Sequence, residues 1–182
     1  MLKQLIVYAS AALFSLAGYA QCLYPPDEFV LETPEDYEEY EVLAYELMAC
    51  LVNDPLAIDI EKTEEAKAFC LVWLGGTSSC TLQVNTNLAP FLDENPEYLY
   101  HYIFSLAIIY RNFPRLSLEE KESEALYLIA LYDERISPKK RNRALKKIKN
   151  LYTKGKLIPE INKIKKENDI PSSIIRKVTS RN

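Results

Sequence analysis

The chain has 182 residues, and removal of an export signal would leave a length that suits one folded domain. A single histidine and only four glycines leave little room for a zinc cluster or a glycine-rich phosphate loop. The formal net charge of −4 is small because a strongly acidic segment and a strongly basic segment offset each other.

The first twenty residues have the pattern of a cleaved export signal. Lys3 supplies a positive start, an apolar run covers 5–16, and small residues end the segment at Ala20. The run is shorter than the roughly 20 apolar residues of a membrane-spanning helix. We therefore expect cleavage after Ala20 and a periplasmic or secreted mature protein. The alternative is an N-terminal membrane anchor.

The first part of the mature chain predicts two helices. Thr33 and Pro34 form a helix start, and Asn53 precedes a stop at Asp54-Pro55. A second helix is predicted over about 61–74, followed by a glycine pair and an extended loop. The inward face of the first helix is predicted to be Tyr37, Tyr40, Ala44, Leu47, Met48 and Leu51, and that of the second Ala66, Phe69, Cys70 and Trp73.

A central helix is predicted from Asn95 to about Asn112, and it is apolar on all sides. No formally charged side chain occurs between Tyr98 and Tyr110, which is typical of a helix in the middle of a bundle. A capping box at 117–120 then opens a helix that is predicted to reach about Glu134.

Two further helices are predicted in the C-terminal part. The first begins at Ser137-Pro138 and ends at Gly155. It is amphipathic, with an inward side of Ala144, Leu145, Ile148, Leu151 and Tyr152 and an outward side of Lys139, Arg143, Lys146 and Lys147. The second is short, with Leu157, Ile161 and Ile164 on one stripe. The sequence thus predicts an all-α fold, an irregular bundle of about six helices. It forms a single domain over 21–168, with a loose basic tail over 169–182.

Four cysteines remain after cleavage, and an even number in an exported chain indicates disulfides. We expect a bundle stapled in its N-terminal half by Cys70–Cys80, within one helix–loop reversal, and by Cys22–Cys50. Cys50–Cys70 is the alternative, because both lie on apolar faces of helices that we expect to be antiparallel neighbours.

The charges are separated along the sequence. Residues 23–100 contain seventeen acidic and two basic residues, whereas residues 135–182 contain sixteen basic and three acidic ones. The two segments could neutralise each other in the fold. Alternatively, the basic segment forms a face that binds an anionic partner. The candidate residues of this face are Lys139, Lys140, Arg141, Arg143, Lys146 and Lys147.

No motif in the chain indicates catalysis. His101 lies in the most apolar stretch, where a hydrogen-bonded core histidine is expected rather than a ligand or a base. The S-x-x-K spacing at Ser137–Lys140 is attributed to a helix cap, because the partner motifs of that chemistry do not occur. We therefore expect a protein that is not an enzyme and has no catalytic residues, metal site or cofactor.

The stretch Ala66–Thr77 contains the pattern Ala-x-x-Phe-x-x-x-Trp-x-x-Gly-Thr. It resembles the signature of an uncharacterised family of exported bacterial all-helical proteins, with similarity continuing through 91–96, the central helix and Lys154–Lys156. This resemblance implies an exported helical domain and assigns no functional residues.

These observations favour a non-enzymatic exported protein that acts by binding another macromolecule. The expected partner is another envelope or secreted protein, with an anionic membrane surface as a second possibility. Nucleic acid is not expected, because Tyr152 is the one stacking aromatic in the basic segment. The alternatives are a periplasmic immunity-type inhibitor of an exported effector, and an enzyme or carrier of a small apolar ligand bound near Trp73 and His101.

Overall fold

The computed structural model describes residues 24–26, 28–53, 60–82, 96–136 and 142–168. These residues form seven helices and no strand, which confirms the all-α prediction. The predicted signal peptide and the predicted tail lie outside the described residues. The helices are α2 (Pro34–Glu39), α3 (Glu41–Asn53), α4 (Ile60–Gly76), α5 (Pro96–Asn112), α6 (Leu118–Ile136), α7 (Arg143–Thr153) and α8 (Leu157–Asn168).

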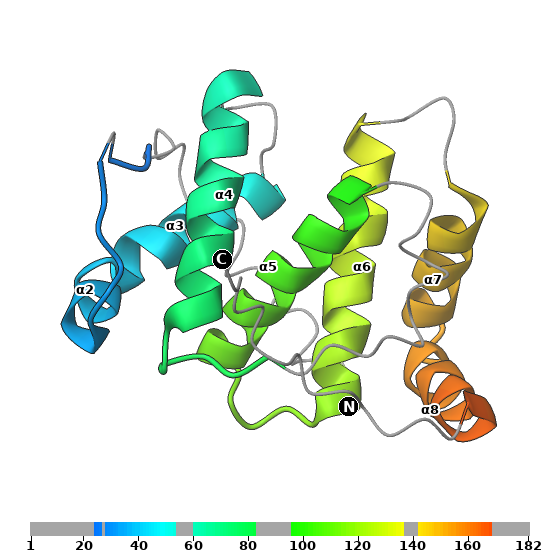
Figure 1. Cartoon of the computed structure of the whole chain (residues 1–182). Helices are drawn as coiled ribbons and strands as arrows, with labels where there is room; N and C mark the ends of the chain where they lie inside the picture. The colour runs from blue at the N-terminus through cyan, green and yellow to red at the C-terminus, as the bar shows by residue number, and fades with distance from the viewer. Residues whose placement is uncertain (1–23, 27, 54–59, 83–95, 137–141, 169–182) are drawn as a thin grey trace.

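Helix α5, which has its charged residues Glu97 and Arg111 in its end turns, lies in the middle of the bundle, as predicted (Figure 1). One of its faces packs against α3 and α4, and we call this cluster the N-terminal core. The opposite face packs against α6, α7 and α8 in a second cluster, the C-terminal core. The N-terminal core takes Phe104, Ala107 and Ile108 from α5, and the C-terminal core takes Tyr98, Tyr102, Leu106 and Ile109. A helix that is buried on two faces has apolar side chains on both, because a charged side chain would lose its hydration there.

The first predicted helix is divided into α2 and α3, and this part of the prediction was wrong. The break lies at Tyr40, whose backbone has φ −90° and ψ 2°. In a continuous helix the carbonyl of Tyr37 would accept from the N–H of Glu41. Here it accepts from the indole Nε1–H of Trp73 at 2.8 Å. The predicted inward stripe is otherwise confirmed, because its members from Tyr40 to Leu51 all pack in the N-terminal core.

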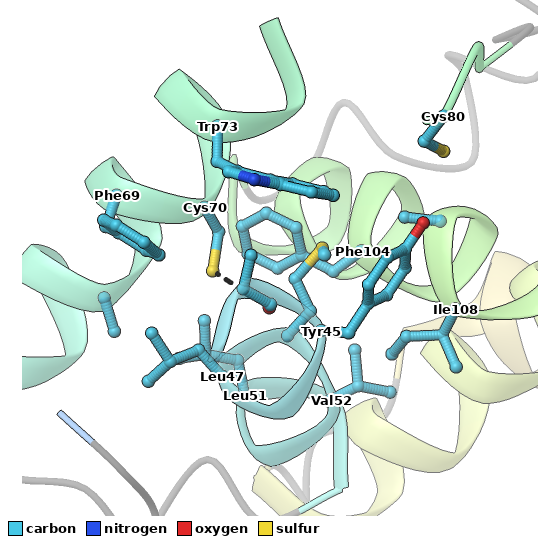
Figure 2. Packing of buried hydrophobic residues seen from close by; sticks show 14 residues of the cluster. Tyr45, Leu47, Leu51, Val52, Phe69, Cys70, Trp73, Cys80, Phe104 and Ile108 are labelled. Carbon is cyan, nitrogen blue, oxygen red and sulfur yellow. Dashed lines mark hydrogen bonds between the residues drawn. The ribbon is translucent and has the colours of Figure 1, made fainter. Parts of the chain in front are cut away.

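The inward face of α4 is confirmed. Phe69, Cys70 and Trp73 are fully buried in the N-terminal core, where Figure 2 shows them facing α3. Trp73 meets Tyr45 edge to face, with ring centroids 5.3 Å apart. Edge-to-face pairs of this kind add stability beyond the burial of their area.

The predicted Cys70–Cys80 bridge was wrong, and so was the Cys50–Cys70 alternative, because Cys70 and Cys80 are both free thiols. Cys70 points into the bundle from α4, and its Sγ lies 3.7 Å from the carbonyl oxygen of Ala44. Cys80 follows α4 and lies on the other side of Trp73 (Figure 2). The loop carries Cys80 away from the face on which Cys70 is buried. The predicted Cys22–Cys50 pair includes Cys22, which lies outside the described residues.

Helix α6 begins with the predicted capping box. The Ser117 N–H donates to Glu120 Oε2 at 2.8 Å, and the Glu120 N–H donates to Ser117 Oγ at 3.2 Å. At its other end, the Arg135 guanidinium donates to the carbonyl oxygens of Val52 and Asn53. These are carbonyls at the C-terminal end of α3, where a cation complements the helix dipole. Arg135 thereby ties α6 to a helix of the N-terminal core.

Within the described residues, none of the helices has both the length and the apolar character that crossing a bilayer would require.

Candidate interaction surface

Helix α7 begins later than its sequence predicts. Its N-cap is Asn142, whose side-chain oxygen accepts from two N–H groups of the first turn at 2.8 and 3.1 Å. The backbone N–H of Asn142 in turn donates to Asp133 Oδ2 on α6 at 3.1 Å. The start is thus fixed by the Asn142 cap and by its contact with α6, and the predicted start at Ser137-Pro138 lies outside the described residues.

The amphipathic character predicted for this helix is confirmed. Leu145 and Ile148 are buried in the C-terminal core, whereas Arg143, Lys146 and Lys147 are exposed. Positions that are three and four residues apart share one side of a helix, so these three cations form one row. The other predicted members of the face, Lys139, Lys140 and Arg141, lie outside the described residues.

The chain turns after α7 at Gly155, as predicted, with φ +65°. The Lys156 N–H donates to the carbonyl of Leu151 at 2.8 Å, which closes the helix in the manner of a Schellman motif. This turn leaves Lys154 and Lys156 exposed beside α7. We define the basic face as Arg143, Lys146, Lys147, Lys154 and Lys156.

Tyr152 holds α7 against α6. Its ring stacks on that of Tyr127 with centroids 4.0 Å apart, and its hydroxyl lies 2.7 and 2.8 Å from the two carboxylate oxygens of Glu124. Burial, opposed by this hydrogen bond, raises the pKa of Glu124. The helix that presents the basic face is therefore fixed by aromatic stacking and a hydrogen bond as well as by its apolar side.

Most cations of the basic face have no carboxylate partner within the described residues. Lys147 pairs with Glu160 at 3.1 Å, across the turn between α7 and α8. No ion pair within the described part of the chain involves Arg143, Lys146, Lys154 or Lys156. Their charges are thus available to an external partner.

The ion pairs of the C-terminal helices form among α6, α7 and α8 themselves. Lys149 pairs with Glu134, and Lys165 pairs with Glu119 and Glu122, at 3.0 Å in each case for Lys165. The ion pairs of the described residues include none between the acidic segment 23–100 and the basic segment after 135. The two segments therefore do not neutralise each other through direct contacts in this part of the chain.

Glu122 is a buried carboxylate that the sequence reasoning missed. It is fully buried on the inward side of α6, one turn before Ala125 and Leu126, and Lys165 reaches it from α8. Burial lowers the pKa of Lys165, but its hydrogen bonds to Glu119 and Glu122 outweigh this and raise it. The spacing of Glu122 from the apolar stripe could have revealed its inward position, although not its partner.

His101 is buried, as predicted, but its expected hydrogen bond is not found at Nδ1, which has no partner within the described residues. Its ring lies against that of Tyr132, with centroids 3.6 Å apart. Burial, and then the charges of Lys67 and Arg135, lower its pKa to about 3. His101 therefore remains neutral in the core at ordinary pH.

No cluster of three or more metal-ligating side chains occurs in the described residues. A surface depression of about 170 Å³ is lined by Glu32, Pro34, Tyr37, Gly76 and Ser78, between α2 and the end of α4. It is smaller than the roughly 300 Å³ of ordinary small-molecule sites. Its lining includes Tyr37, whose carbonyl accepts from Trp73, but it includes neither Trp73 nor His101, near which an apolar ligand was considered.

Comparison with protein-family models, with curated proteins and with solved structures found no match to this chain.

Proposed function

We propose that this protein is an exported, non-enzymatic binding protein, periplasmic or secreted, whose basic face docks on an acidic surface of another protein. The observation that supports this most directly is the row of exposed cations on α7, of which Arg143 and Lys146 have no ion-pair partner in the described residues. A row of exposed charges of one sign raises the rate of encounter with a surface of opposite charge and orients the complex.

The fixed position of α7 supports a binding role for the basic face, rather than that of a merely solvated surface. The helix is capped by Asn142 and stacked through Tyr152, so its cations are presented by a fixed element. A partner that binds a preorganised face loses less conformational freedom than one that must order a mobile segment.

A protein partner is favoured over a membrane surface because the described residues of α7 and α8 expose no large apolar side chain. A helix that lies in a membrane interface combines its cations with exposed Trp, Phe or Leu. Within the described residues, the exposed large hydrophobic side chains all lie outside α7 and α8; they are Tyr24, Phe29, Val30, Val42, Val72 and Leu99. Tyr152, the one aromatic of the basic segment, is occupied by its contact with Tyr127, which gives nucleic acid no free stacking platform.

The test is retention of a protein from an envelope extract by the immobilised mature domain, first at low and then at physiological salt. We expect one stoichiometric partner to survive physiological salt and to be lost with the triple variant Arg143→Glu/Lys146→Glu/Lys147→Glu. The matched control compares the single variants Arg143→Glu and Arg115→Glu, which change the net charge equally. Arg115 is exposed between α5 and α6, so Arg115→Glu should retain the partner.

Vesicles of anionic lipid provide the second arm of this experiment. If the protein binds these vesicles, the triple variant does not, and no protein is retained from the extract, then the partner of the basic face is a membrane surface and not a protein. Retention that is equal for Arg143→Glu and Arg115→Glu, or that occurs only at low salt, would show that the basic face is a solvated surface.

A further inference from the structure

The N-terminal helices present an acidic face of the kind that the basic face requires. Residues 28–53 contain eight acidic residues and no Lys or Arg. Within the described residues, none of the exposed members of this group forms an ion pair. We define the acidic face as the five exposed carboxylates between residues 32 and 46, namely Glu32, Glu35, Glu38, Glu39 and Glu46.

The architecture separates this acidic face from the basic face. Helix α2 packs on α3, whereas α7 packs on α6 and α8. Figure 1 shows α2 at one side of the molecule and α7 and α8 at the other, with α5 and α6 between them. One molecule therefore cannot bring its own two faces together without unfolding.

We propose that the acidic surface bound by the basic face belongs to a second copy of this chain, so that copies join head to tail. This inference rests on the proposed function, because it identifies the partner of that same face. The charges are opposite in sign and similar in amount: residues 142–168 contain nine basic and two acidic residues, a net of 9 − 2 = +7, against −8 for residues 28–53. Charge complementarity of this kind fixes the orientation of two partners.

The acidic face also borders an exposed apolar side chain, which could form the apolar centre of a docking surface. Val42 on α3 is 59% exposed and lies between Glu39 and Glu46, three and four residues away along the chain. Interfaces combine an apolar centre with a polar rim, and the (CH₂)₄ stem of a lysine can cover such a side chain while its charge stays solvated.

The geometry predicts the form of the assembly. A contact between two different faces is heterologous, so a docked pair still offers one free acidic face at one end and one free basic face at the other. The weight-average mass should therefore increase steadily with protein concentration rather than level off at a dimer. The association should also decrease with salt, because the Debye length falls from about 30 Å at 0.01 M to about 3 Å at 1 M.

Complementary charge reversal tests this arrangement by sedimentation equilibrium of the oxidised mature protein. One variant is Glu38→Lys/Glu39→Lys/Glu46→Lys, and the other is Arg143→Glu/Lys146→Glu/Lys147→Glu. Glu38 and Glu39 lie at the C-terminal end of α2, where lysine suits the helix dipole, so folding should be maintained. Each variant alone should remain monomeric, and an equimolar mixture should associate again, because each then meets a face of opposite charge.

A wild-type protein that remains monomeric at 0.01 M salt at all concentrations would overturn the inference. So would variants that associate as the wild type does, or a mixture that fails to associate. The retention experiment separates this failure from that of the proposed function. A monomeric protein whose basic face still retains an acidic partner overturns the head-to-tail contact alone, whereas loss of both results overturns both proposals.

Discussion

The indole N–H of Trp73 donates a hydrogen bond to the backbone carbonyl of Tyr37 at 2.8 Å, and this contact fixes α2 against α4. The Tyr37 hydroxyl completes the arrangement by donating to the carbonyl of Leu31 at 3.0 Å. Gly76, the last residue of α4, lies directly beneath the Tyr37 ring. The helix that contains part of the acidic face is thus positioned by a tryptophan and by the lack of a side chain at Gly76.

Replacement of Gly76 by alanine should separate these elements. A Cβ at Gly76 would overlap the ring and the hydroxyl of Tyr37, so the tyrosine would have to leave its place. We expect the free energy of unfolding to fall by about 1–3 kcal/mol. Gly75→Ala is the matched control: no atom lies within 4 Å of its Cβ, so the helix should gain about 0.5–1 kcal/mol. Urea unfolding followed by Trp73 fluorescence measures both, and equal effects would contradict the packing argument.

The helices that the sequence predicted well are those specified by their own side chains. The uncharged run of α5 and the periodic apolar face of α4 identify buried helices without reference to any partner. The break at Tyr40 could not be predicted in this way, because the group that causes it, Trp73, lies 36 residues from Tyr37. The cysteine pairing failed for a related reason: spacing cannot show which side of α4 the following loop takes.

Asp133 should be essential to the junction of α5, α6 and α7. It is buried, and it accepts from the Tyr98 hydroxyl at 2.7 Å and from the Asn142 N–H at 3.1 Å. Asp133→Ala leaves two buried donors without this acceptor, so we expect a loss of about 2–4 kcal/mol. Tyr98→Phe removes one donor and should cost about 1 kcal/mol. In a double-mutant cycle the pair should be coupled by more than about 0.5 kcal/mol, and additive effects would refute the contact.

The basic face was predictable in part, and the limits have physical causes. The periodicity of α7 placed Arg143, Lys146 and Lys147 outward, because apolar residues on the other side specify the buried face. The N-cap of α7, Asn142, also contacts Asp133 of another helix, which the local sequence does not show, and the predicted start at Ser137-Pro138 lies outside the described residues. The separation of acidic and basic faces depends on the packing order of helices, which charge counts along a sequence do not contain.

The two free thiols give a direct test of the corrected cysteine pairing. Cys70 and Cys80 are buried, and burial raises the pKa of Cys70 to about 12 and also raises that of Cys80. The thiolate is the reactive form, so neither should react with Ellman's reagent in the folded protein at pH 8. Unfolding without reductant should release two thiols per chain, and Cys70→Ala should release one. If Cys22 and Cys50 form the remaining predicted bridge, a tryptic digest of the alkylated protein should contain a disulfide-linked peptide pair with these two cysteines. If no thiol reacts after unfolding, Cys70 and Cys80 are not free and the predicted Cys70–Cys80 bridge is correct after all.

His101 should make the protein less stable in acid. Burial and the charges of Lys67 and Arg135 lower its pKa from 6.5 to about 3 in the folded protein. Between these values the unfolded chain binds a proton that the folded protein does not bind. This histidine therefore lowers the free energy of unfolding as the pH falls from about 6.5 to about 3, by about 1.4 kcal/mol per pH unit.

His101→Phe isolates this contribution from that of the many carboxylates. Phenylalanine maintains a ring against Tyr132, which lies 3.6 Å from the imidazole centroid, but it cannot bind a proton. Urea unfolding at pH 7, 6, 5 and 4 should therefore show the wild type losing stability relative to the variant below about pH 6.5. His101→Gln, which is also uncharged, should share the flatter pH dependence even if its absolute stability is lower. Parallel curves for the wild type and both variants would mean that His101 binds a proton in the folded core as readily as in the unfolded chain. Its burial and the nearby charges of Lys67 and Arg135 argue against this.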